Sequence, residues 1–400
     1  MKTSKIVLNM LVFAVLIAIT TGIGSAEKIS KKTGASKKES ECGYVFKTVT
    51  EVKCTPVKNQ YRTGTCWCFS TVSFIESELL RMGKGEFDLS EMFVVRQAYP
   101  QKAMRFFRMH GMANHSSGGQ AHDVLDVLRA YGMVPETVYT GMRIDEKRHN
   151  HGEMVSVLDG ILDAVMKNKG QRVTPRWLDA YRAVLDVYLG NVPTEFSYNG
   201  NTYTPRRFAD EVMGINPDDY IEFTSYTHHP FYQKCWLDIP DNWTYNANYY
   251  NIPIDDLERT IDHALKSGYS VIWDGDVSEK EFESKKMGFA VVPEKDWDDK
   301  TYREQEEDLT GPVKEKAISQ EMRQHTFDNW TTTDDHLMHV VGIAQDQNGE
   351  KFYIVKNSGG TQRANGGYVY LSRAYFRLKT VALMVHKNAM PEDLKTRLGL

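Results

Sequence analysis

The sequence predicts an α+β fold, because it contains an amphipathic helix in its first half and a pair of strands near its end. Apolar side chains after position 66 recur at steps of three and four residues, the spacing of one helical face. Residues 335–343 and 351–357 instead have the pattern of strands, and the Asn348-Gly349 pair between them favours a tight turn. With 400 residues, 41% of them hydrophobic, the chain is long enough to form two lobes.

The predicted helix begins at Cys66 and stops at Gly83. Its apolar stripe consists of Phe69, Val72, Ile75, Leu79 and Met82. The unpaired N–H groups of a first helical turn favour the thiolate form of a cysteine placed there. Gly64 allows a close approach of the preceding loop, and the Gln60 amide together with the Cys66 backbone N–H would donate to an oxyanion. A second helix is expected at 121–131, before Gly132.

The two predicted strands carry a histidine and an amide in suitable places. His336 stands at the entry of the first strand and Asn357 at the exit of the second, so a hairpin places both at one end of the sheet. His339 is a competing base. It lies three positions further on, and an odd offset along a strand puts the two side chains on opposite faces. Only one of them can then face Cys66.

Each of these features also has a simpler explanation. A lone cysteine at a helix start is more often a small buried residue than a catalyst. His336 and His339 suggest a metal pair, but they lack the i, i+4 spacing and the glutamate of a zinc helix. Asp274 and Asp276 suggest acid–base chemistry, yet Asp-Gly-Asp at this place is more typical of a turn. We therefore predict neither a metal nor a cofactor.

Several separate pieces of the sequence together resemble the papain-like cysteine peptidases. The pieces are the stretch from Gln60 to Cys66-Trp67, Leu89-Ser90-Glu91, Gly118-Gly119-Gln120, His336 and Asn357. Within that clan, the long central insertion and the stretch from residues 252–255 to residues 274–277 resemble the bleomycin hydrolase and aminopeptidase C group. The resemblance runs in family order from about residue 43 to about residue 390.

The resemblance implies a papain-like fold, in which a helical lobe carries Cys66 and a β-barrel-like lobe carries His336 and Asn357. It implies that Cys66 is the nucleophile and that His336, favoured over His339 by the family register, is the general base and later the acid. Gln60 becomes the oxyanion donor, and the Asn357 side chain orients the imidazole.

The resemblance also implies a set of substrate contacts. Gly118 and Gly119 offer their backbone to an extended peptide. Trp67 and Leu400 are further candidates, although the simplest role of Trp67 is in the core. The expected partners are therefore peptides, and the net charge of -4 gives no reason to expect nucleic acid.

The expected activity is thiol-dependent hydrolysis of short peptides from the amino end, as in an aminopeptidase. The alternatives are a papain-like endopeptidase with an open cleft and a peptide-binding protein with weak catalysis. Gly359 motivates the peptide-binding alternative, because the clan usually has tryptophan there to shield the Asn–His hydrogen bond from water. The segment after His386 motivates the endopeptidase alternative, because it is shorter than the bleomycin hydrolase arm that receives the substrate amino group.

The beginning of the sequence predicts an exported protein. Lys2 and Lys5 precede an apolar run, and small residues at 24–26 suit signal-peptide cleavage after residue 26. We expect a periplasmic or secreted enzyme without stable membrane insertion, the alternative being an uncleaved N-terminal anchor. Residues 27–41 are expected to form a flexible basic leash.

Residues 42–400 form the predicted peptidase domain, with an insertion at about 146–250. The first part of the insertion has a helical pattern, and its second part is rich in Tyr, Asn and Pro, as loops are. The insertion is expected to shape the cleft or to make a homo-oligomer contact, unless it is a plain structural elaboration. Besides Cys66, the domain has four cysteines, for which three disulfide pairings or four free thiols remain open. They are Cys42, Cys54, Cys68 and Cys235.

Overall fold

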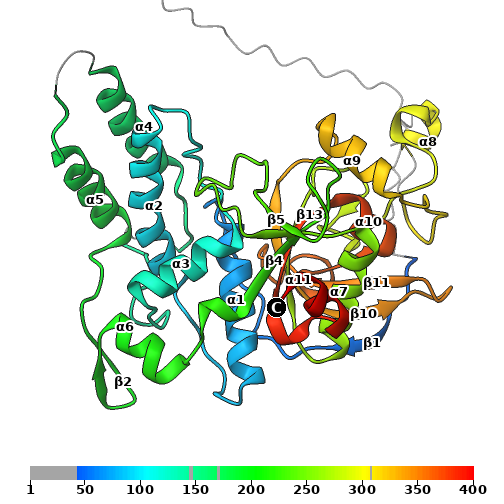
Figure 1. The fold of residues 1–400 in the computed structure, drawn as a ribbon, viewed down its shortest axis with the longest axis horizontal. Coiled ribbons are helices and arrows are strands. Elements are labelled where there is room, and N and C mark those ends of the chain that lie inside the picture. The colour runs from blue at the N-terminus through cyan, green and yellow to red at the C-terminus, as the bar shows by residue number, and fades with distance from the viewer. Residues whose placement is uncertain (1–42, 144–146, 169–171, 307–308) are drawn as a thin grey trace, which may run out of the picture. The chain divides into compact units, whose positions relative to one another are not determined.

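The computed structural model describes residues 43–143, 147–168, 172–306 and 309–400. In this part of the chain, α2 to α5 gather on one side of α1 and a large sheet lies on the other (Figure 1). This arrangement confirms the predicted α+β class. The helices are α1 (Cys66–Arg81), α2 (Glu91–Arg108), α3 (Ala121–Tyr131), α4 (Gly152–Lys167), α5 (Arg176–Leu189), α6 (Pro205–Arg207), α7 (Ile254–Lys266), α8 (Tyr302–Glu306), α9 (Gln320–Asp328), α10 (Arg373–Lys379) and α11 (Glu392–Leu398).

The sheet is mostly antiparallel and is open. Its strand order is β5-β6-β4-β13-β7-β10-β11-β12-β9-β8, with β1 paired to β10. Because the order ends at β5 and β8, the described strands do not close into the barrel that the family resemblance implies. The strands are β1 (Lys47–Glu51), β4 (Tyr220–Thr224), β5 (Gln233–Cys235), β6 (Tyr249–Asn251), β7 (Val271–Gly275), β8 (Phe282–Glu283), β9 (Phe289–Ala290), β10 (His336–Gln345), β11 (Lys351–Lys356), β12 (Tyr368–Ser372) and β13 (Thr380–His386), and β2 (Phe196–Tyr198) pairs separately with β3 (Asn201–Tyr203).

The predicted helix at Cys66 is confirmed as α1, which ends at Arg81. Gly83, two residues later, has a left-handed backbone conformation (φ 73°). Four residues of the predicted stripe are buried in the core of the helical lobe, whereas Met82 is 39% exposed. The predicted helix at 121–131 is confirmed as α3. Ser90 begins α2 by accepting a hydrogen bond from the Phe93 N–H at 3.0 Å, the capping role that a serine plays at a helix start. These helices hold the head of α1 in a fixed place.

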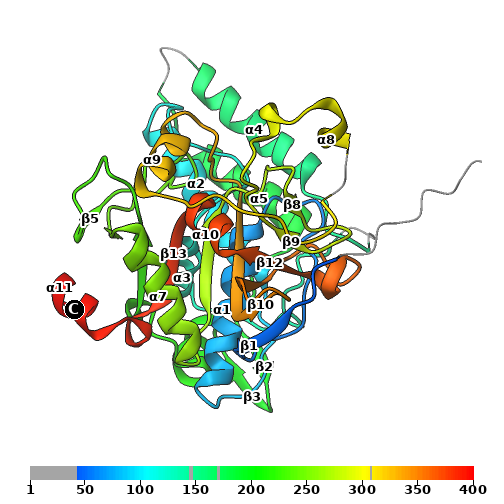
Figure 2. The ribbon, with the colours of Figure 1, turned by 90° about the vertical axis from the view of Figure 1, so that its right-hand side faces the viewer.

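The predicted hairpin is confirmed as β10 and β11, joined by a turn in which Gly349 takes a positive φ of 85°. The register pairs His339 with Lys356, so His336 and Asn357 stand at the same end of the hairpin. Met338 and Val340 face a core under α7, and Leu337 faces the helical lobe. The sheet therefore lies between α1 and α7 (Figure 2).

The central insertion is only partly separate from the sheet. Its first half forms α4 and α5, in agreement with the predicted helical pattern. Its second half was expected to be loop, but β4 pairs with β13 and β6 pairs with β4. That expectation is wrong because burial in the sheet outweighs the loop-like composition of the segment.

Some predictions concern residues outside the described ranges. The signal peptide, the leash at 27–41 and Cys42 lie there, so export stays a prediction. Among the described residues, no helix has the length and apolar character needed to cross a membrane. The described cysteines, namely Cys54, Cys66, Cys68 and Cys235, are all free thiols.

Candidate active site

Cys66 is the first residue of α1 and is half-buried. The loop before it passes so close to Ser117 that a Cβ at Gly64 would lie 2.8 Å from the Ser117 Cβ, and Gly64 has a φ of 65°. Glycine is required there on both grounds. The next residue, Trp67, is fully buried and donates from Nε1 to the Ser117 carbonyl at 3.0 Å. Trp67 thus anchors the loop of residues 60–65, called the nucleophile loop after the proposed role of Cys66, to the segment that contains Gly118 and Gly119.

The hairpin brings His336 and Asn357 together. His336 Nε2 lies 2.8 Å from Asn357 Oδ1, which also accepts the Ser358 N–H at 2.7 Å. Because Oδ1 is an acceptor, Nε2 carries the proton and Nδ1 is left for the other side of the ring. Cys66 acts on the same ring through its charge. His336 therefore lies under the influence of both the Asn357 side chain and Cys66.

The charge state of His336 depends on these two neighbours. Burial by itself lowers the pKa of His336, because an apolar surrounding disfavours the imidazolium. The negative charge of Cys66 and the hydrogen bonds with Cys66 and Asn357 outweigh burial, so the pKa is raised. The arrangement favours the imidazolium form of His336.

We expect the pKa of His336 to fall when Cys66 is replaced by alanine. The substitution removes the charge and the hydrogen bond that raise this pKa and leaves burial, which lowers it. NMR titration of the His336 ring measures the change, with Cys235→Ala as a control because Cys235 lies in another part of the core. An unchanged or higher midpoint in Cys66→Ala would show that Cys66 does not stabilise the imidazolium.

Gln60 is held in place by the strand end that follows Asn357. The Gln60 N–H donates to the Ser358 carbonyl at 2.9 Å, and the Ser358 hydroxyl donates to Gln60 Oε1 at 2.6 Å. This leaves Gln60 Nε2 without a described acceptor, and the backbone N–H of Cys66 has no described acceptor either. Two free donors beside a nucleophile can stabilise an oxyanion. Ser358, which positions Gln60, has no sequence signal apart from its place after Asn357.

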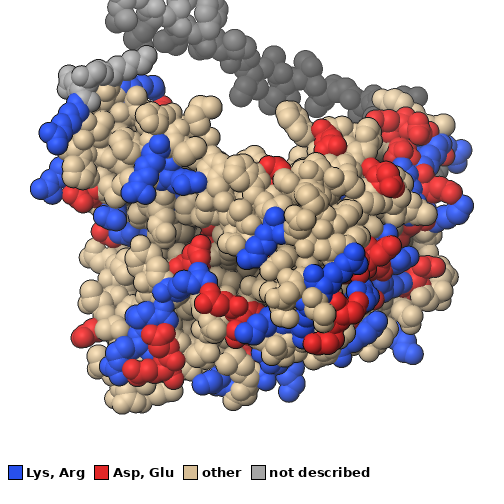
Figure 3. Space-filling view, in the orientation of Figure 1, with Lys and Arg blue, Asp and Glu red and all other residues tan. Residues whose placement is uncertain are grey.

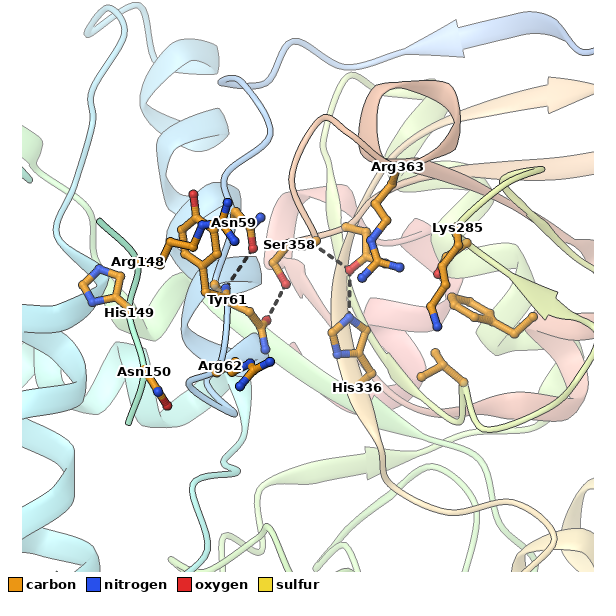
Figure 4. A pocket seen from close by; sticks show the side chains of 16 residues that line it. Asn59, Tyr61, Arg62, Arg148, His149, Asn150, Lys285, His336, Ser358 and Arg363 are labelled. Carbon is orange, nitrogen blue, oxygen red and sulfur yellow. Dashed lines mark hydrogen bonds between the residues drawn. The ribbon is translucent and has the colours of Figure 1, made fainter. Parts of the chain in front are cut away.

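Arg363 lies beside Gly359, where the resemblance leads one to expect tryptophan. A Cβ at position 359 would meet the Arg363 side chain at 3.4 Å, and Figure 4 shows the Arg363 side chain on the same side of the cavity as His336. The side chain that a residue at position 359 would meet is therefore a cation rather than an aromatic ring.

His339, the competing candidate for the base, is fully buried and hydrogen-bonded. Its Nδ1 lies 2.9 Å from the Ser73 hydroxyl, and burial together with the charge of Lys356 lowers its pKa well below the usual value. The expectation that it lies on the face away from Cys66 is wrong, because Ser73 belongs to α1 itself. Side chains alternate between the two faces from Leu337 to Val340, whereas His336 is the first residue of β10 and lies at the end of this strand.

A cavity of about 760 Å³ opens beside His336 (Figure 4). Gln60, His336 and Asn357 line it, and the segment around His149 closes its far wall. That segment is fixed to the nucleophile loop, since the Arg62 N–H donates to the His149 carbonyl at 3.2 Å. The other lining side chains include four cations, namely Arg62, Arg148, Lys285 and Arg363.

Gly118 and Gly119 do not line this cavity and lie on the Trp67 side of the site. A Cβ at Gly119 would be 3.1 Å from the Trp67 ring, and a Cβ at Gly118 would overlap the carboxylate of Asp241. Asp241 Oδ1 accepts hydrogen bonds from Asn114 and, at 3.2 Å, from Ser116. Asp241 Oδ2 has no described donor. A loop carboxylate therefore occupies the backbone edge that was predicted to receive the substrate.

The loop that carries Asp241 is anchored to the helical lobe. Trp243 Nε1 donates to Asp123 of α3 at 2.7 Å, and Thr244 Oγ1 lies 2.8 Å from His122 Nε2. Sequence analysis missed Asp241, because nothing in its local sequence distinguishes it from other carboxylates in loops.

Two further carboxyl groups, Asp274 and Asp334, lie near Cys66 and Asp241. Burial raises the pKa of Asp274 to about 8, and the Cys66 and Asp241 charges act in the same direction. Burial and the charge of Asp274 raise the pKa of Asp334, to which Gln120 donates at 3.3 Å. The prediction that Asp274 belongs to a turn is wrong, because Asp274 lies within β7 and is 1% exposed.

The structure does not bring Leu400 to the site. Leu400 follows α11, which packs against α7 (Figure 2). Asp393 of α11 forms a 2.7 Å ion pair with Arg259 of α7, and Leu394 is buried in the core under α7. None of the residues that line the cavity comes from this part of the chain. Leu400 is therefore not included in the site proposed below.

A separate group of side chains has the composition of a metal site. Nε2 of His228 and Nε2 of His229 lie 3.1 and 2.9 Å from one oxygen of Asp238. Gln324 accepts the Thr227 N–H and therefore presents its amino group to His228 Nδ1 at 3.0 Å. His228 Nε2 then carries a proton and donates to Asp238, which describes a hydrogen-bonded group.

Comparisons with known proteins agree with this geometry. The model of the papain family cysteine proteases matches residues 46–171, and that of the peptidase C1-like family matches residues 191–399. Aminopeptidase G of Lactobacillus delbrueckii subsp. lactis is 22% identical over 86% of this chain and 84% of its own length. Bleomycin hydrolase of Mus musculus is 22% identical over 88% of this chain and 84% of its own length.

A solved structure supports the fold. The crystal structure of PepW from Lactobacillus rhamnosis superposes with a TM-score of 0.67 at 19% identity, over 88% of this chain and 84% of that one. The predicted resemblance to the bleomycin hydrolase and aminopeptidase group is confirmed by these relatives. The chain is a cysteine-type peptidase and belongs to the peptidase C1-like family.

Proposed function

We propose that this chain is an aminopeptidase that removes residues from the amino end of short peptides through Cys66, His336 and Asn357. The observation that carries the proposal is the position of Asp241, whose free carboxylate oxygen covers Gly118 beside the nucleophile loop. The names of its relatives, aminopeptidase G and bleomycin hydrolase, support the same activity.

In the proposed reaction the Cys66 thiolate attacks the carbonyl carbon of the scissile peptide bond. Gln60 Nε2 and the Cys66 backbone N–H receive the developing oxyanion, an interaction worth about 10²- to 10³-fold in kcat for each donor. The His336 imidazolium then gives its proton to the departing amine, and a thioester on Cys66 remains. His336, now neutral, takes a proton from water, which hydrolyses the thioester and restores the thiolate.

Asp241 supports exopeptidase rather than endopeptidase cleavage. A long peptide that continues past Gly118 would have to displace the loop that Trp243 and Thr244 anchor to Asp123 and His122 of α3. A peptide that begins at this point would instead place its α-ammonium group against Asp241 Oδ2. A carboxylate that is partly buried and already oriented by Asn114 and Ser116 binds such a cation well.

The proposal is tested by comparing peptides that differ only in their amino end. We expect the reduced enzyme to hydrolyse a free dipeptide or aminoacyl arylamide at least about tenfold better than its N-acetylated counterpart, because only the former carries the ammonium group. Equal kcat/KM for both would contradict the aminopeptidase proposal and favour an open-cleft endopeptidase. Peptide binding without hydrolysis would instead favour the peptide-binding alternative.

A further inference from the structure

We propose that the cavity beside His336 binds a carboxylate on the leaving part of the substrate, so that the enzyme prefers very short peptides with a free carboxyl end. The inference rests on the proposed function, because it assumes that His336 protonates the leaving amine. It adds a specificity that neither the family nor the catalytic residues require.

The chemistry places the leaving part of the peptide in this cavity. The departing amine takes its proton from His336, so the residue that begins with that amine must lie next to the imidazole. His336 and Asn357 line the cavity, whereas Gly118 and Gly119, on the other side of Trp67, do not. The residue after the scissile bond therefore enters the cavity.

The cavity carries positive charge that described residues do not neutralise. Arg62, Arg148, Lys285 and Arg363 line it, and no carboxylate is among the lining residues. None of these four forms an ion pair with a described acidic residue. On the lower part of the face shown in Figure 3, basic and acidic side chains are intermixed. Four unpaired cations around one cavity therefore indicate an anionic ligand.

The four cations differ in their surroundings. Arg148 lies over the Tyr61 ring, with its guanidinium carbon 5.6 Å from the ring centre, and Arg363 lies against Gly359. Figure 4 shows Arg62 and Lys285 on opposite sides of His336. Arg62 and Lys285 are therefore the cations that test the inference most cleanly, because no described contact with an aromatic ring or with Gly359 involves either side chain.

The ligand chemistry that fits is a carboxylate close to the scissile bond. Guanidinium groups bind planar carboxylates through paired hydrogen bonds, and a lysine adds a point charge. In a dipeptide or tripeptide, the C-terminal carboxylate lies one or two residues after the scissile bond. An acidic side chain directly after the scissile bond would supply the same group. A short peptide thus presents its ammonium end toward Asp241 and its carboxylate toward the cations.

The test compares three substrates that all have a free amino end. They are a dipeptide, the same dipeptide with its carboxyl end amidated, and an amidated dipeptide with glutamate after the scissile bond. We expect kcat/KM to be about tenfold higher for the free dipeptide than for its amide, as one charge-assisted hydrogen bond provides. Recovery of that rate by the glutamate dipeptide amide identifies a side-chain carboxylate as an equal ligand, and no recovery assigns the preference to the carboxyl end.

The variants Arg62→Gln and Lys285→Gln should each remove most of this preference by raising KM for the free dipeptide, while kcat/KM for the dipeptide amide changes less. Lys286→Gln is the matched control, because this exposed lysine is next to Lys285 and does not line the cavity. Equal kcat/KM for acid and amide in the wild type would overturn the inference. Failure of the proposed function looks different, since the neutral arylamide would then not be hydrolysed either.

Discussion

Replacing Cys66 by alanine is expected to lower kcat for dipeptide hydrolysis by about 10⁴-fold or more, the loss typical of a missing catalytic nucleophile. The variant keeps Gln60 and His336 in place, but without a thiolate no thioester forms. Measured kcat values for wild type and variant at saturating substrate give the result. The fold should be unaffected, because Cys66 is half-buried at a helix start and alanine suits a helix.

Cys68 provides a matched control for this prediction. It lies two residues away on α1, is fully buried, and its Sγ lies 3.3 Å from the Glu91 carbonyl. Burial raises the pKa of the Cys68 thiol well above its usual value, so this thiol is unreactive at neutral pH. We expect Cys68→Ala to retain activity and a thiol-directed epoxide to modify Cys66 alone. Hydrolysis that survives in Cys66→Ala would show that another group attacks the substrate.

Replacing Asp241 by asparagine is expected to lower kcat/KM for unblocked substrates by about 10²-fold, as removal of one partner from a buried charge pair does. Asparagine has the same size and can still accept the hydrogen bonds of Asn114 and Ser116, so the loop should keep its place. The N-acetylated substrate, which has no ammonium group, should lose little. The discrimination between free and blocked amino ends therefore falls, which paired kinetics on the two substrates measure.

The control for Asp241 is Asp238→Asn in the same loop. Asp238 contacts His228 and His229 rather than Gly118, so its substitution changes the loop charge equally without touching the proposed ammonium site. We expect it to leave the ratio of the two kcat/KM values unchanged. If Asp241→Asn also leaves that ratio unchanged, Asp241 does not receive the amino end, and Asp274 becomes the carboxyl group to test.

The parts of the site that local sequence signals define could be predicted. Cys66 heads a helix whose stripe and stop are contiguous in sequence, and His336 and Asn357 flank one hairpin with an Asn-Gly turn. Local patterns of this kind depend on neighbours along the chain, so one sequence contains them.

The parts that depend on distant segments could not be predicted. Asp241 meets Gly118 across more than 100 residues. The side of the sheet that His339 faces depends on where β10 enters the sheet, which residue spacing alone does not give. The strands inside the central insertion were missed because their pairing partners, such as β13, lie far along the chain.

The central claim is that Cys66 carries the amino-terminal residue of the substrate as a thioester during turnover. Acid quenching of the wild-type enzyme during hydrolysis of an unblocked dipeptide, followed by mass spectrometry of the fragment that contains Cys66, tests it directly. We predict an adduct on Cys66 whose mass equals a single aminoacyl group, absent from Cys66→Ala. An adduct on another residue, or a Cys66 adduct formed equally well from an N-acetylated peptide, would contradict the account.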